Sequence, residues 1–169
     1  ALQALDRLPW DGTIGCFHAD SSVESLARWF TTDWLNTDHE DQMLELLSAD
    51  LDLSDGSTST IETTYFVLAL AQAYSDPEKY RTSQRFRWLR KLGTVFAMRD
   101  RDRLGAIVNI HNNHWVALTI DCTKNIVGYG DGFRGKPPST LHTHLDWWLF
   151  QHLGVEFTWK DIPAAKQHN

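Results

Sequence analysis

The segment HWVALTIDC at residues 114–122 determines how the rest of the chain is interpreted. It begins with a histidine and then alternates apolar residues, as a β-strand with one buried face does. Two further short segments rich in β-forming residues lie beside it, LGAIVNI at residues 104–110 and IVGYG at residues 126–130. Because the connector at residues 123–125 is short, we expect the strands to form an antiparallel meander.

Helices are expected before this meander, where capping residues and apolar spacings follow one another. The expected elements are, in order, a short helix after Ser21 or Ser22, a helix from Thr37 or Asp38, a loop at residues 51–60, a buried helix at residues 61–74, and a helix from Asp76-Pro77 through Phe96. The region is therefore predicted to be mainly helical up to the first strand.

After the meander the chain returns to a helix. Pro137 and Pro138 begin an amphipathic helix that Gly154 ends, and residues 155–159 alternate as a last strand does. The order of helices, strands, helix and strand indicates an α+β fold rather than a repeated βαβ pattern. The chain has 169 residues, of which 42% are hydrophobic, and this fits a single domain at residues 1–169.

Charge and cysteine content exclude several protein classes. The net charge of −6 argues against a nucleic-acid partner, because phosphates require cationic surface. Neither a membrane-spanning apolar run nor a signal peptide is visible, so we expect no membrane partner. The only two cysteines, Cys16 and Cys122, form no CxxC pair, which suits a reducing compartment. We therefore expect an intracellular protein, nuclear or cytoplasmic, without a cofactor.

His114 and Asp131 are the candidate catalytic residues. His114 begins one strand and Asp131 follows the next, so an antiparallel pair brings both to one edge of the sheet. The register leaves Asp131 short of the position opposite His114, and Gly128, Gly130 and Gly132 allow the necessary bend. A carboxylate there can orient the imidazole and stabilise its charged form. Taken alone, such a pair is also typical of a structural histidine.

Four separated segments resemble the ubiquitin-like-protein proteases, the family that includes the SUMO proteases. These segments are Trp34-Leu35-Asn36, the histidine strand HWVALTID, Tyr129-Gly130-Asp131-Gly132, and Ile162-Pro163 with Gln167-His168-Asn169. They follow one another in the family's order over most of the chain. The resemblance implies a papain-like, SUMO-protease-like α+β fold, in which helices flank a central mixed sheet.

The resemblance also implies an activity. A cysteine peptidase of this family cleaves after the Gly-Gly tail of a SUMO-type ubiquitin-like protein, in precursors or in conjugates. It implies that His114 is the general base and acid, that Asp131 orients it, and that Gln167 helps to hold the oxyanion. It further implies that Trp34 and Trp115 form a narrow slot that only glycines can pass.

The nucleophile implied by the resemblance is absent from residues 1–169. We expect it just beyond Asn169, at the start of a helix, in a longer chain or in a separate C-terminal piece. Cys122 lies on the histidine strand, and both cysteines are interpreted as ordinary thiols. Without that helix, we expect apolar surface to be exposed near Ile120 and Trp148.

Three alternatives remain open from the sequence. The histidines at positions 111, 114, 142, 144 and 152 suggest zinc, but His142 and His144 diverge on a helix, so we expect no metal site. The same fold also suits a non-catalytic module that binds a ubiquitin-like protein. The third alternative is a processing protease of a virus or mobile element. An Asp-Cys-Gly sequence after Asn169 favours an enzyme over the binding module.

Overall fold

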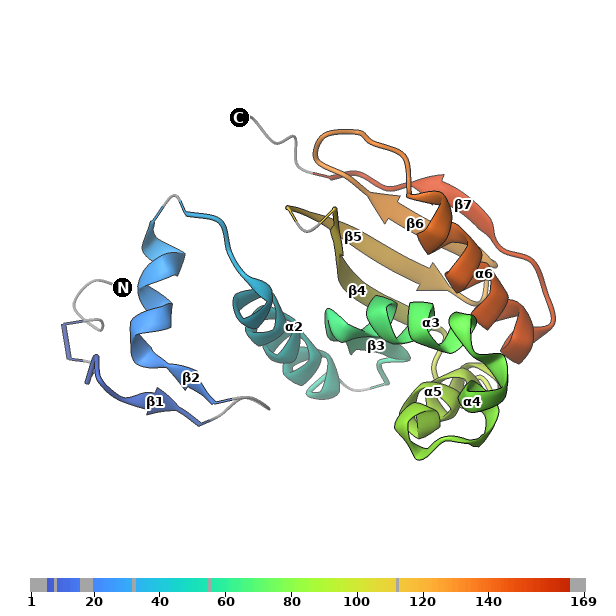
Figure 1. The fold of residues 1–169 in the computed structure, drawn as a ribbon, viewed down its shortest axis with the longest axis horizontal. Coiled ribbons are helices and arrows are strands. Elements are labelled where there is room, and N and C mark those ends of the chain that lie inside the picture. The colour runs from blue at the N-terminus through green and yellow to red at the C-terminus, as the bar shows by residue number, and fades with distance from the viewer. Residues whose placement is uncertain are drawn as a thin grey trace.

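The computed structural model of the protein describes residues 6–7, 9–15, 20–31, 33–54, 56–111 and 113–164 (Figure 1). The N-terminal elements and the sheet lie at opposite ends of the molecule, and helix α2 (Thr37–Asp52) lies between them. No helix among the described residues combines the length and the apolar character needed to cross a membrane.

A five-stranded mixed sheet forms the centre of the fold. Its strands are β3 (Ser59–Glu62), β4 (Arg103–Ile110), β5 (His114–Asp121), β6 (Ile126–Gly130) and β7 (Thr158–Asp161). They are arranged in the order β3-β4-β5-β6-β7. The central pairs are antiparallel and the two outer pairs are parallel. The predicted meander and the predicted α+β fold with a mixed sheet are confirmed.

Three helices cover one face of this sheet, namely α3 (Tyr65–Ser75), α5 (Arg87–Ala97) and α6 (Ser139–Leu153) (Figure 1). Trp148 of α6 is fully buried at the centre of this layer and packs edge-on against Phe66 and Phe96. Apolar side chains at alternate positions of β4 and β5 face the helices, which explains their period-2 pattern. Gly154 ends α6 in the left-handed conformation with a φ of 66°, as predicted.

The expectation that Ile120 and Trp148 would be exposed is wrong. Both are buried, because Ile120 faces the layer of helices in which Trp148 lies. The side chains that are exposed on β5, Ala117 and Thr119, point to the opposite face of the sheet. The apolar face that the sequence indicates is thus covered by the helices of this same chain.

Two of the expected helices differ in the structure. Residues 59–62 form β3, parallel to β4, before α3 begins at Tyr65, because pairing with a distant strand outweighs the local apolar pattern. The helix expected from Asp76-Pro77 begins there, with the Asp76 side chain accepting from Lys79 N. It is interrupted at Ser83, whose backbone is extended and whose carbonyl accepts from the Arg90 guanidinium at 3.0 Å.

That interruption divides the predicted helix into α4 (Pro77–Thr82), the 3-10 turn η2 (Gln84–Phe86) and α5. The last strand also lies later than predicted. It was expected at residues 155–159, whereas β7 spans Thr158–Asp161, because the chain must first run beyond the end of α6 before it pairs with β6.

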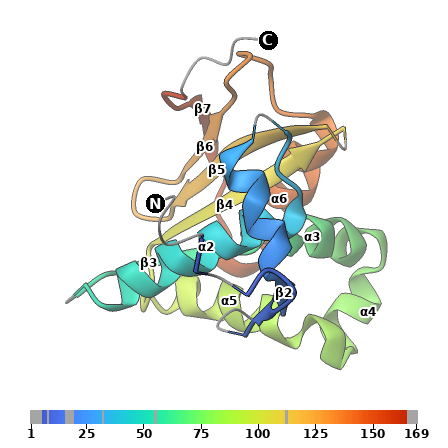
Figure 2. The ribbon, with the colours of Figure 1, turned by 90° about the vertical axis from the view of Figure 1, so that its left-hand side faces the viewer.

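The N-terminal elements are the hairpin β1 (Thr13–Ile14) and β2 (Ser21–Ser22), followed by the 3-10 helix η1 (Val23–Phe30) (Figure 2). Ser22 caps η1 as predicted, accepting from Ser25 N at 3.2 Å. The buried ring of His39 on α2 is within 2.8 Å of the carbonyl oxygen of Ser25. This contact connects η1 to α2 and so fixes the segment that lies between them.

Candidate active site

His114 and Asp131 meet at one edge of the sheet. Ala117 of β5 pairs with Gly130 of β6, so in plain register Asp131 would lie beside Val116 rather than His114. The chain turns immediately after Gly130, and His114 Nε2 lies 2.7 Å from Asp131 Oδ1. The predicted hydrogen bond is therefore present, and it depends on the turn that the register requires.

The loop that follows Asp131 surrounds its carboxylate with donors. The backbone N–H of Phe133 donates to Oδ1 at 2.7 Å, and that of Gly135 donates to Oδ2 at 3.0 Å. Burial alone would raise the pKa of Asp131, but the hydrogen bonds from His114, Phe133 and Gly135 outweigh it and hold the pKa below its ordinary value. An ionised carboxylate can only accept, so Nε2 of His114 carries the proton of their shared bond.

The second ring nitrogen of His114 has no hydrogen-bond partner in the part of the chain that the structure describes. Its side chain is almost fully buried, and Nδ1 makes no hydrogen bond to any residue that the structure describes. One face of the ring packs against Phe133, with the ring centroids 4.7 Å apart and the planes inclined by 36°. With Nε2 donating to Asp131, Nδ1 is the nitrogen that can accept a proton from a reacting group.

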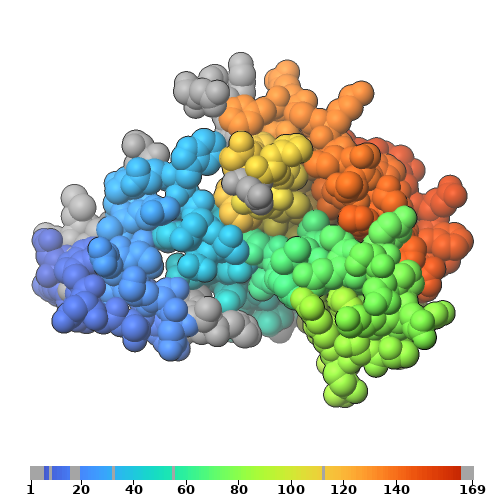
Figure 3. Space-filling model, in the orientation of Figure 1, coloured from blue at the N-terminus to red at the C-terminus, as the bar shows by residue number. Residues whose placement is uncertain are grey.

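A cleft of about 970 Å³ contains this pair. Trp34 and Trp115 both line it, and each is held through the backbone: Arg28 donates to the Trp34 carbonyl at 3.0 Å, and Trp115 Nε1 donates to the Leu35 carbonyl at 3.3 Å. Figure 3 shows the surface hollowed between the blue N-terminal elements and the yellow ends of β4 and β5. The cleft therefore lies between the N-terminal elements and the sheet.

Asn36 explains why Trp34 is available to the cleft. Its side chain accepts from His39 N at 3.2 Å and caps α2, so the chain becomes helical only after the Trp34-Leu35 pair. Trp34 consequently lies in the loop before the helix, with 62% of its surface exposed. So large an exposed indole beside a cleft is typical of a binding surface.

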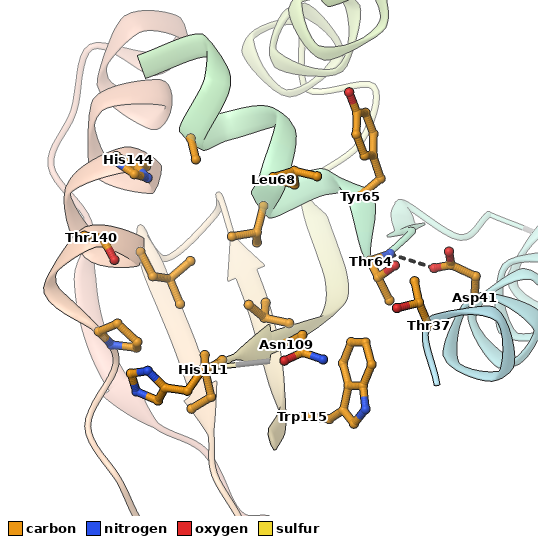
Figure 4. Close-up of a pocket in the computed structure, with 16 residues that line it drawn as sticks. Thr37, Asp41, Thr64, Tyr65, Leu68, Asn109, His111, Trp115, Thr140 and His144 are labelled. Atoms are coloured by element: carbon orange, nitrogen blue, oxygen red, sulfur yellow. Dashed lines mark hydrogen bonds between the residues drawn. The ribbon is translucent and has the colours of Figure 1, made fainter. Parts of the chain in front are cut away.

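A second cavity, of about 610 Å³, lies beside the first and shares Trp115 as a wall (Figure 4). It is bounded by the starts of α3 and α6, and Thr64 N donates there to Asp41 Oδ1 at 2.8 Å. His144 projects into it, but neither His114 nor Asp131 lines it. The arrangement suited to proton transfer therefore belongs to the larger cleft.

Comparison with known protein families identifies the family of this chain. Residues 33–151 match the family described as the Ulp1 protease family, C-terminal catalytic domain. The chain belongs to the Ulp1 protease family. The matched residues include Trp34, Trp115, His114 and Asp131, and the family relationship that the sequence motifs indicate is confirmed. The chain is thus a domain of cysteine-protease type. No curated protein sequence matches it.

Solved structures of Ulp1 proteases share the fold. The SUMO protease Ulp1 with its catalytic cysteine oxidised to a sulfinic acid superposes with a TM-score of 0.70 at 16% identity, covering 99% of this chain and 73% of that one. The Ulp1 protease domain in complex with Smt3, the yeast ortholog of SUMO, gives a TM-score of 0.65 at 18% identity, covering 96% and 71%.

A bacterial protein shares the fold at a greater distance. The effector XopD of Xanthomonas campestris, bound to ubiquitin, gives a TM-score of 0.52 at 18% identity. The alignment covers 82% of this chain and 67% of that one. At such low identities these likenesses establish the fold, and the site has to be argued from the residues of this chain.

Cys122 of this Ulp1-family domain is unsuited to be the nucleophile. It directly follows β5 at the end opposite to His114, roughly 25 Å away at about 3.3 Å per residue. The thiol is buried, and burial raises its pKa to about 11. Cys16 and the proposed oxyanion residue Gln167 both lie outside the residues that the structure describes.

Two of the other histidines, His142 and His152, have partners of their own. His142 Nδ1 lies 2.7 Å from Asp146 Oδ2, with its ring stacked on Trp159, and His152 Nε2 lies 2.7 Å from the Tyr80 hydroxyl. Across the described ranges, no three or more histidine, cysteine, aspartate or glutamate residues are grouped as a metal site requires.

Sequence reasoning missed Phe133 and the Leu35 carbonyl. Phe133 lies only two residues after Asp131, and an aromatic residue so close to a candidate catalytic carboxylate was a signal that could have been used. The Leu35 carbonyl carries no such signal, because backbone acceptors are the same at every position.

Proposed function

We propose that this chain is the histidine- and aspartate-bearing part of a cysteine peptidase that cleaves after Gly-Gly of a SUMO-type ubiquitin-like protein, in precursors or conjugates. The observation that carries the proposal is the His114 imidazole beside the cleft, whose Nε2 donates to Asp131 and whose buried Nδ1 has no hydrogen-bond partner among the described residues. The proposal places the nucleophilic cysteine after Asn169 in the full-length protein, since Cys122 is remote from His114.

In the proposed reaction His114 transfers one proton in each of the two steps. Nδ1 removes the thiol proton, and the thiolate attacks the carbonyl carbon of the second glycine. As the tetrahedral intermediate collapses, the C–N bond breaks and the protonated imidazole gives its proton to the leaving amine. Water then attacks the thioester carbonyl while Nδ1 accepts a proton from it, and as the C–S bond breaks the protonated imidazole returns that proton to the departing thiolate. Asp131 holds the ring throughout, and Gln167 is proposed to donate to the oxyanion.

Trp34 and Trp115 are proposed to form the glycine-selective slot. Both line the cleft that holds His114. The Trp34 carbonyl accepts from Arg28, and Trp115 Nε1 donates to the Leu35 carbonyl, so both residues are anchored at the segment just before α2. Two facing indoles leave room for a polypeptide backbone but not for side chains, which would select a Gly-Gly tail. The partner is suggested by the SUMO and ubiquitin complexes of the structural neighbours.

The test is cleavage of a SUMO precursor by the full-length protein and by two single variants. His114→Ala should abolish cleavage, whereas the control His142→Ala, at an exposed position of α6, should retain it. Tight binding of the precursor without cleavage by the unmodified protein would favour a non-catalytic binding module. Equal cleavage by both variants would contradict the role of His114.

A further inference from the structure

We infer that Phe133 is a positioning residue for His114, an inference that rests on the proposed function. The single hydrogen bond between Nε2 and Asp131 fixes one point of the imidazole, about which the ring plane could still tilt. The Phe133 ring covers one face of the imidazole at 4.7 Å and supplies the second constraint. Together the two contacts define where Nδ1 points.

The loop that carries Phe133 is closed around the same carboxylate. The backbone N–H of Phe133 donates to Asp131 Oδ1, and Arg134 N donates to the Asp131 carbonyl at 3.0 Å. Gly135 packs directly against this carboxylate, because a Cβ atom built at its position would lie only 2.6 Å from Asp131 Oδ2. The carboxylate that holds Nε2 therefore also holds in place the ring that covers the imidazole.

Phe133 contributes little to the packing of the fold. Its side chain is 44% exposed although it lines the cleft, and it does not belong to the buried core. Truncating it should therefore leave the fold intact while releasing one face of His114. An exposed phenylalanine of the core-distant face of α6, Phe150, provides a matched control.

The experiment measures steady-state cleavage of a SUMO precursor by the full-length protein. Phe133→Ala is expected to lower kcat about tenfold with KM changed less than threefold, because proper orientation of the base matters in the transition state. Phe133→Trp should restore kcat to within about threefold of the original value, and Phe150→Ala should change neither constant. A change in KM alone, or an unchanged kcat, would overturn the inference.

A second readout does not depend on activity. In NMR spectra of the same full-length protein, the imidazole C–H resonances of His114 should carry a ring-current shift that Phe133→Ala removes and Phe133→Trp keeps. If the unmodified protein cleaves no substrate, the proposed function fails, whereas this shift still decides whether Phe133 orients the ring. Identical His114 resonances in Phe133→Ala would overturn the contact itself.

Discussion

Two aspartates lie where neighbouring strands of the sheet end, Asp121 as the last residue of β5 and Asp131 just after β6, and the loop that follows each one donates hydrogen bonds to it. Asp121 ends β5, and its Oδ1 accepts from the N–H groups of Thr123 and Lys124 at 3.1 and 3.0 Å. Asp131 follows β6 and accepts from Phe133 and Gly135 in a similar way. Locally, the two loops satisfy a carboxylate by the same chemistry.

The two aspartates differ in what else they meet. Asp121 is 21% exposed at its side chain and lies near the cations of Lys124 and Arg103, at 3.5 and 4.0 Å. Asp131 is 4% exposed and meets the buried imidazole of His114 instead. In both cases the loop donates hydrogen bonds that favour an ionised carboxylate. The side chains around that carboxylate determine whether it stabilises a turn, as Asp121 does, or orients a histidine, as Asp131 does.

Replacing each aspartate in turn should give the largest difference. Asp131→Asn should lower cleavage of a SUMO precursor by roughly 10²–10⁴-fold, because the imidazole loses the charged, acceptor-only carboxylate that fixes its tautomer and stabilises its protonated form. Asp121→Asn should leave cleavage within about twofold, since its partners are solvated cations. Progress curves of the full-length variants provide the measurement. Comparable losses in both would remove the distinction between the two sites.

The slot should show its effect in binding. Trp115→Ala should weaken the binding of a ubiquitin-like protein ending in Gly-Gly by about tenfold, the order expected for truncating a buried aromatic at an interface. The control is Trp10→Ala, at an exposed tryptophan of the N-terminal segment. Calorimetric titration compares the two variants. An unchanged affinity for Trp115→Ala would show that the indole contributes no wall to the slot.

A third carboxylate, Glu62 of β3, sharpens the comparison because no described residue donates a hydrogen bond to it. Burial raises its pKa from 4.5 to about 7. Because the pKa of Glu62 is higher in the folded state than in the unfolded state, its contribution to the free energy of unfolding is fully present below the pKa of the unfolded state. That contribution is lost as the pH rises through the folded-state pKa of about 7. The loss amounts to about 3 kcal/mol.

Glu62→Gln should therefore remove most of the decrease in the free energy of unfolding between about pH 5 and pH 8. Denaturant unfolding at these two pH values measures it, with Glu156→Gln, at an exposed position, as the matched control. If the two variants retain the same decrease, Glu62 does not titrate in this range.

The smallest expected effect is on the decrease in the free energy of unfolding at acidic pH. For both aspartates burial raises the pKa, but hydrogen bonds and nearby positive groups outweigh it and lower the pKa. Each therefore stabilises the fold above the unfolded value of about 3.9 and loses that contribution as pH falls through its folded pKa. Unfolding followed from pH 5 to pH 2 should therefore show a shallower acid limb for Asp131→Asn and for Asp121→Asn than for the unmodified protein, and an unchanged limb in either variant would show that its carboxylate does not contribute.

The sequence predicted those features that depend on local pattern. The strands β4, β5 and β6 lie within one residue of their predicted ends, and α6 ends at Gly154 as expected. The meeting of His114 and Asp131 also followed from strand order and a short connector. All of these features depend on residues that are close together in the sequence, so hydrophobic periodicity and turn residues are sufficient to predict them.

Features that depend on distant partners could not be predicted. β3 pairs with β4 across some forty residues, and its apolar residues resemble the start of the helix that follows. The interruption at Ser83 is stabilised by Arg90, and Ile120 is covered by helices on either side of it in sequence. In the site, the packing of Phe133 on His114 arises only once the loop after Asp131 closes.

The most direct measurement of the central claim is covalent capture with a SUMO-type protein whose Gly-Gly end carries a thiol-reactive electrophile, followed by peptide mapping. In the full-length protein we expect one adduct, on a cysteine after Asn169, that His114→Ala abolishes and His142→Ala retains. Cys122 should remain unmodified, because its thiol is buried far from His114. An adduct on Cys122 or Cys16, or one that persists in His114→Ala, would contradict the account.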